Sequence, residues 1–165
     1  MAHSSCRVET LAQALGVTKG GFYGYFSNRE ALLTEMLDTW EREVTDGVIA
    51  RVEESGGDAR TRLERLFTIV SSGAGGPVTD TSADLAIREW ARRDADVAER
   101  LRRVDNRRMD YLRSLFSSFC SDQDDVEVRS LLTFSLRIGS QFVAADNGPR
   151  SRGEVMQLSK DWLLR

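Results

Sequence analysis

The chain has 165 residues, of which 41% are hydrophobic and 30% are charged, and its formal net charge is -3. This composition fits one compact soluble domain or two small ones, and it excludes a disordered or fibrous chain. No apolar run approaches the roughly 20 residues of a membrane-spanning helix, and the first residues lack the plan of a signal peptide. We therefore expect a cytoplasmic protein with no membrane partner.

Histidine and cysteine are too scarce to support metal or catalytic chemistry. His3 is the one histidine, and Cys6 and Cys120 are the two cysteines, without the spacing of metal ligands. We interpret both cysteines as reduced thiols, with a redox-sensing pair as the less favoured alternative. The acidic residues within 122–127 do not fit a calcium loop and are typical of a first helical turn. The sequence therefore predicts no catalytic residue, no metal site, no cofactor and no enzymatic activity.

Apolar residues recur with helical spacing along almost the whole chain, and no stretch shows the alternation of a strand. Near the start, this spacing predicts a short helix over residues 8–15 that Gly16 ends, followed by a second short helix from Thr18. Ser27 and Glu30 have the spacing of a capping box, so we expect Ser27 to cap the next helix.

The rest of the chain continues as longer helices. An apolar stripe at residues 33–48 predicts a helix of about 25 residues, which Gly56 and Gly57 end. Asp58 and Asp94 are placed to cap later helices. The remaining stripes lie at residues 63–70, 85–90, 97–119, 131–143 and 155–163, with breaks near 73–77 and 148–153. The predicted fold class is all-α.

The two short helices at the start have the lengths and the turn of a helix-turn-helix. At about 100° per residue, Phe22 and Phe26 fall on one side of the second helix as core anchors, and Gly20 and Gly24 fall opposite them. The face directed at DNA bases would then be bare glycine. A glycine-rich turn whose aromatic side chains only fill a core is the alternative interpretation.

Polar groups flank this glycine face. The Thr18 hydroxyl and two tyrosine hydroxyls can reach backbone phosphates, and Lys19 is the only long side chain left to contact a base edge. Residues 7–29 also carry a small basic excess in an acidic chain. The predicted DNA-binding residues are Thr18, Lys19, Gly20, Gly21, Tyr23 and Tyr25.

The segment from Arg7 to Leu33 resembles the DNA-binding region of TetR-family transcriptional regulators. The likeness is carried chiefly by Leu15-Gly16-Val17-Thr18-Lys19-Gly20-Gly21-Phe22-Tyr23-Gly24-Tyr25-Phe26. A weaker likeness at residues 86–94 and 105–108 extends it along the chain.

The resemblance implies a ligand-responsive regulator, a repressor, that binds double-stranded operator DNA as a homodimer. A helix-turn-helix domain over residues 1–46 would hold DNA, and a helical bundle over residues 47–165 would bind a small-molecule effector and pair with its copy. The alternative is a helical ligand- or partner-binding relative that has lost DNA binding.

The chain departs from the family pattern in two ways. Members usually begin with a further helix that packs across the helix-turn-helix, and the residues before Arg7 leave no room for it, so we expect that helix to be missing. The position of Gly24 is commonly a larger residue in the family, so we expect few direct contacts to bases.

A largely apolar ligand cavity is predicted within residues 50–145. Aromatic residues are in excess on the inward helix faces, and two polar side chains one turn apart could orient a guest. The alternative is that the aromatic residues simply fill the core. The predicted ligand-binding residues are Phe67, Trp90, Tyr111, Phe134, Arg137 and Gln141.

Small residues mark the expected pairing surface. Ser135 and Gly139 form a notch one turn apart in a helix expected over about residues 124–145, which would join the last helix in a four-helix interface. The predicted interface residues are Leu132, Ser135, Leu136, Gly139, Val143, Val155 and Trp162.

Residues 88–113 are rich in arginine but interleaved with acidic residues. This alternation favours a solvated helix surface with ion pairs over a second nucleic-acid site.

Overall fold

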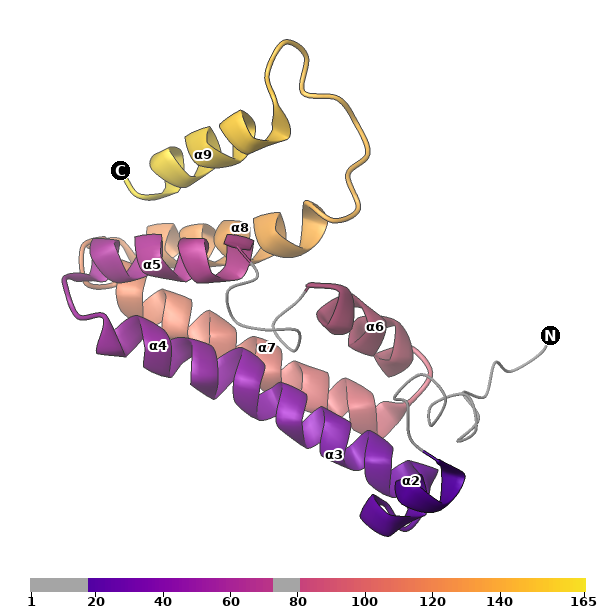
Figure 1. Cartoon of the computed structure of the whole chain (residues 1–165). Helices are drawn as coiled ribbons and strands as arrows, with labels where there is room; N and C mark the ends of the chain where they lie inside the picture. Colours follow the sequence, from indigo (N-terminus) through magenta and orange to yellow (C-terminus); the bar gives the residue numbers. More distant parts are fainter. Residues whose placement is uncertain (1–17, 73–80) are drawn as a thin grey trace. The chain divides into compact units, whose positions relative to one another are not determined.

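The computed structural model describes residues 18–72 and 81–165 (Figure 1). The described residues form helices joined by short connections, with no strand among them, so the predicted all-α class is confirmed. Backbone contacts divide the chain into two compact units, Met1–Trp40 and Glu41–Arg165. The helix expected over residues 8–15, any helix before it and the break expected near 73–77 lie outside the described residues.

The first unit contains α2 (Lys19–Tyr25) and most of α3 (Arg29–Glu41). The Thr18 hydroxyl accepts a hydrogen bond from the backbone N–H of Gly21 at 3.0 Å, which confirms that a helix starts at Thr18. The predicted Ser27 cap is wrong. The Asn28 side-chain oxygen accepts instead from the N–H of Ala31 at 2.8 Å, because α3 begins one residue later than a Ser27 cap requires.

Helical residues then run without a break to Glu54, as the apolar stripe predicted. They include the π-helical segment η1 (Arg42–Gly47) and α4 (Val48–Glu54). Gly56 and Gly57 end the run with φ angles of 65° and 92°, a conformation that glycine adopts without steric cost. No feature of the sequence predicted the π-helical segment, in which each helical turn holds more residues than in an α-helix.

The second unit is built around α7. After α4, the helices of this unit are α5 (Ala59–Ser72), α6 (Thr81–Ala91), α7 (Ala95–Phe116), α8 (Gln123–Gly139) and α9 (Arg152–Leu163). Within this unit α7 packs against α5, α6, α8 and η1, while α9 packs on α8 (Figure 1). Asp58 and Asp94 cap α5 and α7 as predicted, each by accepting backbone N–H hydrogen bonds.

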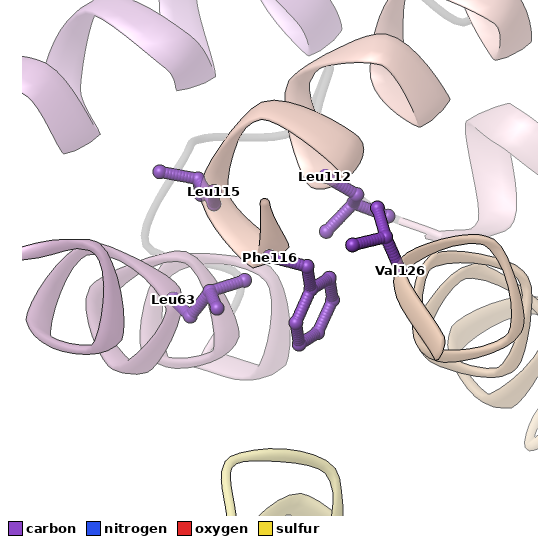
Figure 2. Close-up of a cluster of buried hydrophobic side chains, with 5 residues drawn as sticks. All are labelled: Leu63, Leu112, Leu115, Phe116 and Val126. Atoms are coloured by element: carbon purple, nitrogen blue, oxygen red, sulfur yellow. The ribbon is translucent and has the colours of Figure 1, made fainter. Parts of the chain in front are cut away.

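One hydrophobic cluster joins three of these helices. Leu63 of α5 and Val126 of α8 meet Leu112, Leu115 and Phe116 of α7, and all five side chains are buried (Figure 2). Burying a side chain of this size contributes about 1.5–3 kcal/mol. The cluster therefore fixes α5 and α8 on α7, and with them the walls of the cavity described below.

The helix expected to reach about residue 145 ends at Gly139, so this prediction is wrong. Phe142 and Val143 lie beyond the helix and are exposed. Arg152, at the start of α9, donates hydrogen bonds to the carbonyl oxygens of Ser140 and Val143. These carbonyls are thus satisfied by a side chain from the next helix, and another turn of α8 is not needed.

Candidate functional sites

The helix α2 presents an open glycine face flanked by exposed tyrosine side chains. Tyr23 is 48% exposed and Tyr25 is 85% exposed. A Cβ atom added at Gly24 would meet nothing within 4 Å, and one at Gly20 would meet only the Thr18 hydroxyl, at 3.9 Å. The backbone N–H of Gly21 donates to the Thr18 hydroxyl, which caps α2. The α2 surface that we predicted from the sequence to contact DNA is therefore accessible on this unit. The Lys19 side chain lies outside the described part of the chain.

The arginine-rich stretch is covered by ion pairs, as predicted. Every arginine of the set has a carboxylate oxygen within 2.7–3.7 Å of its guanidinium group. The set comprises Arg88, Arg92, Arg93, Arg100, Arg102, Arg103, Arg107, Arg108 and Arg113. Because each positive charge is paired within the chain, this surface does not offer the unbalanced basic patch of a nucleic-acid site.

A buried carboxylate lies at the centre of this network. Asp84 is 2% exposed and accepts hydrogen bonds from Arg88 Nε and Arg108 Nη1, both at 2.9 Å. Burial by itself would raise the pKa of the Asp84 carboxyl, but the charges of Arg108 and Arg88 and their hydrogen bonds hold that pKa below its ordinary value. The network thus ties α6 to α7 and places Arg108 beside the cavity.

A cavity of about 420 Å³ lies within the second unit, between η1, α4, α5, α7, α8 and the start of α9. Most of its wall is aliphatic or aromatic. Of the predicted ligand-binding residues, those that line it are Phe67, Tyr111, Phe134, Arg137 and Gln141. Trp90 is not among the lining residues. Its indole N–H donates to the Asp94 carboxylate at 3.2 Å, at the junction between α6 and α7.

Tyr111 contributes its ring to this cavity while its hydroxyl is held elsewhere. The hydroxyl donates to Glu53 Oε1 at 2.7 Å, and Glu53 also pairs with Arg62 at 3.0 Å. Burial, followed by the hydrogen bond to Glu53, raises the pKa of Tyr111. Tyr111 therefore stays protonated, with its hydroxyl engaged by Glu53.

Two lining threonines have buried hydroxyl groups. Thr45 lies in η1 and Thr133 in α8, and they are 2% and 7% exposed. Neither hydroxyl has a hydrogen-bond partner within residues 18–72 and 81–165. A buried polar group without a partner costs about 1–3 kcal/mol.

Sequence reasoning missed several of the lining residues. Thr45 comes from the π-helical segment, and Arg108 and Arg152 come from the network and from the start of α9. The apolar stripe through Val44 and Val48 was the one feature of the sequence that indicated the part of the wall formed by η1 and α4. Arg108 and Arg152 line the cavity only because helices that are distant in sequence pack together. The spacing of residues along the sequence therefore could not predict their place in the wall.

A second, more open hollow of about 650 Å³ lies between α8 and α9. We call this hollow the α8–α9 groove. All seven residues predicted for the pairing surface line it. Among them, Leu132, Val143 and Trp162 are 42%, 55% and 54% exposed. A Cβ atom added at Gly139 would meet nothing within 4 Å. The residues predicted for the pairing surface therefore lie together around this groove, although Val143 lies beyond the end of α8.

A comparison with known protein families matches the N-terminal part of the chain. Residues 4–36 match the sequence model of the family described as bacterial regulatory proteins, tetR family. This segment includes α2, its Thr18 cap and the exposed tyrosines. The match confirms the resemblance of this N-terminal segment to the DNA-binding region of TetR-family transcriptional regulators. Searches of curated proteins and of solved structures found no match.

Two further observations concern the described residues alone. None of their helices has the length and apolar character needed to span a bilayer. No three histidine, cysteine, aspartate or glutamate side chains in residues 18–72 and 81–165 are grouped as a metal ion would require.

Proposed function

We propose that the chain is a ligand-responsive repressor that binds operator DNA as a homodimer and is released from it by a small molecule. The observation that carries the proposal is the family match at residues 4–36, together with the exposed glycine face of α2 inside that match. As a regulator it acts where bacterial operator DNA lies, in the cytoplasm, and it works by binding rather than by catalysis.

We assign DNA contact to α2 and its cap. The hydroxyl groups of Tyr23 and Tyr25 are on opposite flanks and exposed, which suits contacts to phosphates on either side of a groove. We assign Lys19 to a base edge, because it is the only long side chain among these residues, and the glycines would let the helix backbone approach the bases. The proposed contact residues are Thr18, Lys19, Gly20, Gly21, Tyr23 and Tyr25.

We assign effector binding to the cavity of the second unit. Its volume of about 420 Å³ falls in the range of about 300–1,000 Å³ that small-molecule sites occupy. Its wall combines apolar side chains with a few polar groups, which is the usual composition of such sites. Phe67, Tyr111, Phe134, Arg137 and Gln141 form the proposed contact set, and Trp90, which does not line the cavity, is left out of it.

We assign homodimer formation to the α8–α9 groove. Exposed apolar side chains gather there, and large apolar patches on soluble proteins mark interaction surfaces. Two copies of α8 and α9 would form a four-helix interface. Small residues at Ser135 and Gly139 let the backbones approach closely in that arrangement.

The DNA assignment is tested by selecting fragments of the source genome that the protein retains and measuring their affinity by fluorescence anisotropy at two salt concentrations. We expect affinity to fall with salt as phosphate contacts are lost. Lys19→Ala should relax base preference, and Tyr23→Phe should weaken all duplexes about equally. Lys160→Ala removes the same charge from α9 and is the matched control.

The outcomes separate the two candidate functions. Retention of specific fragments that a reporter shows to be silenced supports the repressor. Retention of no fragment, with a compound still bound by the second unit, would instead identify a relative that has lost DNA binding.

A further inference from the structure

The cavity of the second unit and the α8–α9 groove share part of their walls. Leu136 of α8 and Ser140, which directly follows that helix, line both spaces. Arg152 and Met156 of α9 also line both. A shift of these residues therefore changes the shape of the cavity and the shape of the groove at once.

The C-terminal end of α9 is fixed by contacts within the protomer. The Leu163 side chain is buried, and its carbonyl oxygen accepts a hydrogen bond from Arg129 of α8 at 2.6 Å. Arg60 of α5 donates to the carbonyl oxygen of Arg165 at 3.2 Å. Leu164 packs on the hydrophobic cluster of α5, α7 and α8. The position of this end of α9 therefore does not depend on a guest in the cavity.

The N-terminal half of α9 is packed less closely. None of residues 151–158 is buried. Arg152 ties this half to the chain that follows α8, because it donates to the carbonyl oxygens of Ser140 and Val143. A guest in the cavity would add dispersion contacts to Met156 and Leu136, which line it from α9 and α8. Such a guest would therefore hold this half of α9 on α8.

The same half of α9 forms one side of the groove. Val155 and Leu158 line the groove together with Met156. Leu158 is 48% exposed in the protomer, so a partner protomer seated on the groove would cover it. Close packing at an interface requires that both surfaces keep their shape. The fit of the partner therefore depends on where the N-terminal half of α9 lies on α8.

We infer that a guest in the cavity strengthens the homodimer, because it holds the N-terminal half of α9 in the position that the partner's groove fits. This inference rests on the proposed effector site and the proposed pairing surface, and it adds the regulation that links them. By thermodynamic linkage, dimer formation then strengthens guest binding by the same factor. Couplings between two sites are commonly about 5–150-fold.

The test measures the dimer dissociation constant of the full-length protein by sedimentation velocity over a dilution series, without DNA. In its first arm the probe is 1-decanol, whose alkyl chain suits a largely apolar cavity. We expect 1-decanol to lower the dissociation constant about fivefold or more. This arm uses the unaltered protein, so it does not depend on how any variant folds. A probe that entered the groove instead would compete with the partner and weaken the dimer.

The second arm fills the cavity from the protein's own chain. Val70 of α5 lines the cavity and not the groove, so Val70→Phe adds volume to the cavity alone. We expect this variant to form a tighter dimer without any probe. Thr133→Val is the matched control, because Thr133 also lines only the cavity and the substitution adds no volume. It should leave the dissociation constant unchanged.

A variant of the shared wall then locates the coupling. Met156→Ala truncates a side chain that lines both spaces, and in this background neither 1-decanol nor Val70→Phe should tighten the dimer. Leu158→Ala, at a residue that lines only the groove, is its control. Leu158→Ala should weaken the dimer and yet keep the tightening by 1-decanol.

Tightening by 1-decanol or by Val70→Phe that is lost in Met156→Ala supports the inference. Three results overturn it: no tightening in either arm, a weaker dimer with 1-decanol, or tightening that persists unchanged in Met156→Ala. The proposed function is judged separately. A monomeric wild-type protein would reject the proposed homodimer and the coupling with it, whereas a dimer that does not respond to filling of the cavity would reject only the coupling.

Discussion

Arg88 of α6 donates through both terminal guanidinium nitrogens to the two carboxylate oxygens of Asp105 in α7, each at 2.8 Å. Its third nitrogen, Nε, donates to Asp84, one turn earlier in α6. Burial would lower the pKa of Arg88, but the hydrogen bonds and charges of Asp105 and Asp84 raise it. This arginine is therefore one of the links that hold α6 on α7, beside the bond between Arg108 and Asp84.

Removing the buried carboxylate at the centre of this network should be costly. Asp84→Asn leaves Arg88 and Arg108 largely buried without one of their counter-charges, and we expect a loss of about 3–5 kcal/mol of unfolding free energy. Urea denaturation measures it. Asp110→Asn, at a carboxylate whose side chain is 72% exposed, is the control and should cost under about 1 kcal/mol. Equal costs would show that the Asp84 network adds little to stability.

The same carboxylate predicts a pH dependence. The pKa of Asp84 lies below its ordinary value of 3.8 in the folded protein, so its stabilising effect is present above that value. The effect is lost as the pH falls through the folded pKa. The stability difference between the wild-type protein and Asp84→Asn should therefore be constant between about pH 5 and 7 and shrink below about pH 4. Denaturation curves across this range check it, and a difference that grows on acidification contradicts it.

The buried hydroxyl of Thr133 predicts a stabilising substitution. Thr133→Val replaces a hydroxyl group without a hydrogen-bond partner in the described structure by a methyl group of similar size, and we expect a gain of about 1 kcal/mol. Thr68→Val is the matched control, because the Thr68 hydroxyl is exposed and donates to the carbonyl oxygen of Glu64 at 2.9 Å. Thermal unfolding of both variants decides the point, and a loss of stability in Thr133→Val would refute it.

The α8–α9 groove predicts the oligomeric state. In one protomer a Cβ at Gly139 meets nothing within 4 Å, so Gly139→Arg should leave the protomer folded. In a four-helix interface it would bury an unpaired charge at a cost of several kcal/mol. Light scattering should show a dimer for the wild-type protein and a monomer for the variant. Ser118→Arg, just past the end of α7 and outside the groove, should remain a dimer; a monomeric wild-type protein at micromolar concentration would reject the interface.

The cap of α2 predicts an effect on DNA binding. Gly20, Gly21 and Gly24 each cost the helix roughly 1 kcal/mol relative to alanine, so α2 depends on its cap. Thr18→Ala removes the acceptor for the Gly21 N–H and should cost about 1 kcal/mol, or about fivefold in operator affinity. Thr18→Ser keeps the hydroxyl and should bind nearly as well as the wild-type protein. Anisotropy titrations on one operator fragment compare the three, and equal affinities would show that the cap is dispensable.

The amino-acid sequence alone determined the local features of this protein. The Thr18, Asp58 and Asp94 caps were predictable because each joins a side chain to a backbone N–H two or three residues away. The residues of the α8–α9 groove were predictable for a related reason. Helical spacing alone places apolar residues on one face, whatever that face later contacts.

Only the tertiary structure decided where α8 ends and which residues surround the cavity. α8 ends at Gly139, and Arg152, from the next helix, donates hydrogen bonds to the carbonyl oxygens of Ser140 and Val143 just beyond it. Arg108 and Arg137 reach the cavity from two different helices. Such contacts join residues far apart along the chain, so their energies depend on how the helices pack and leave no periodic trace in the sequence.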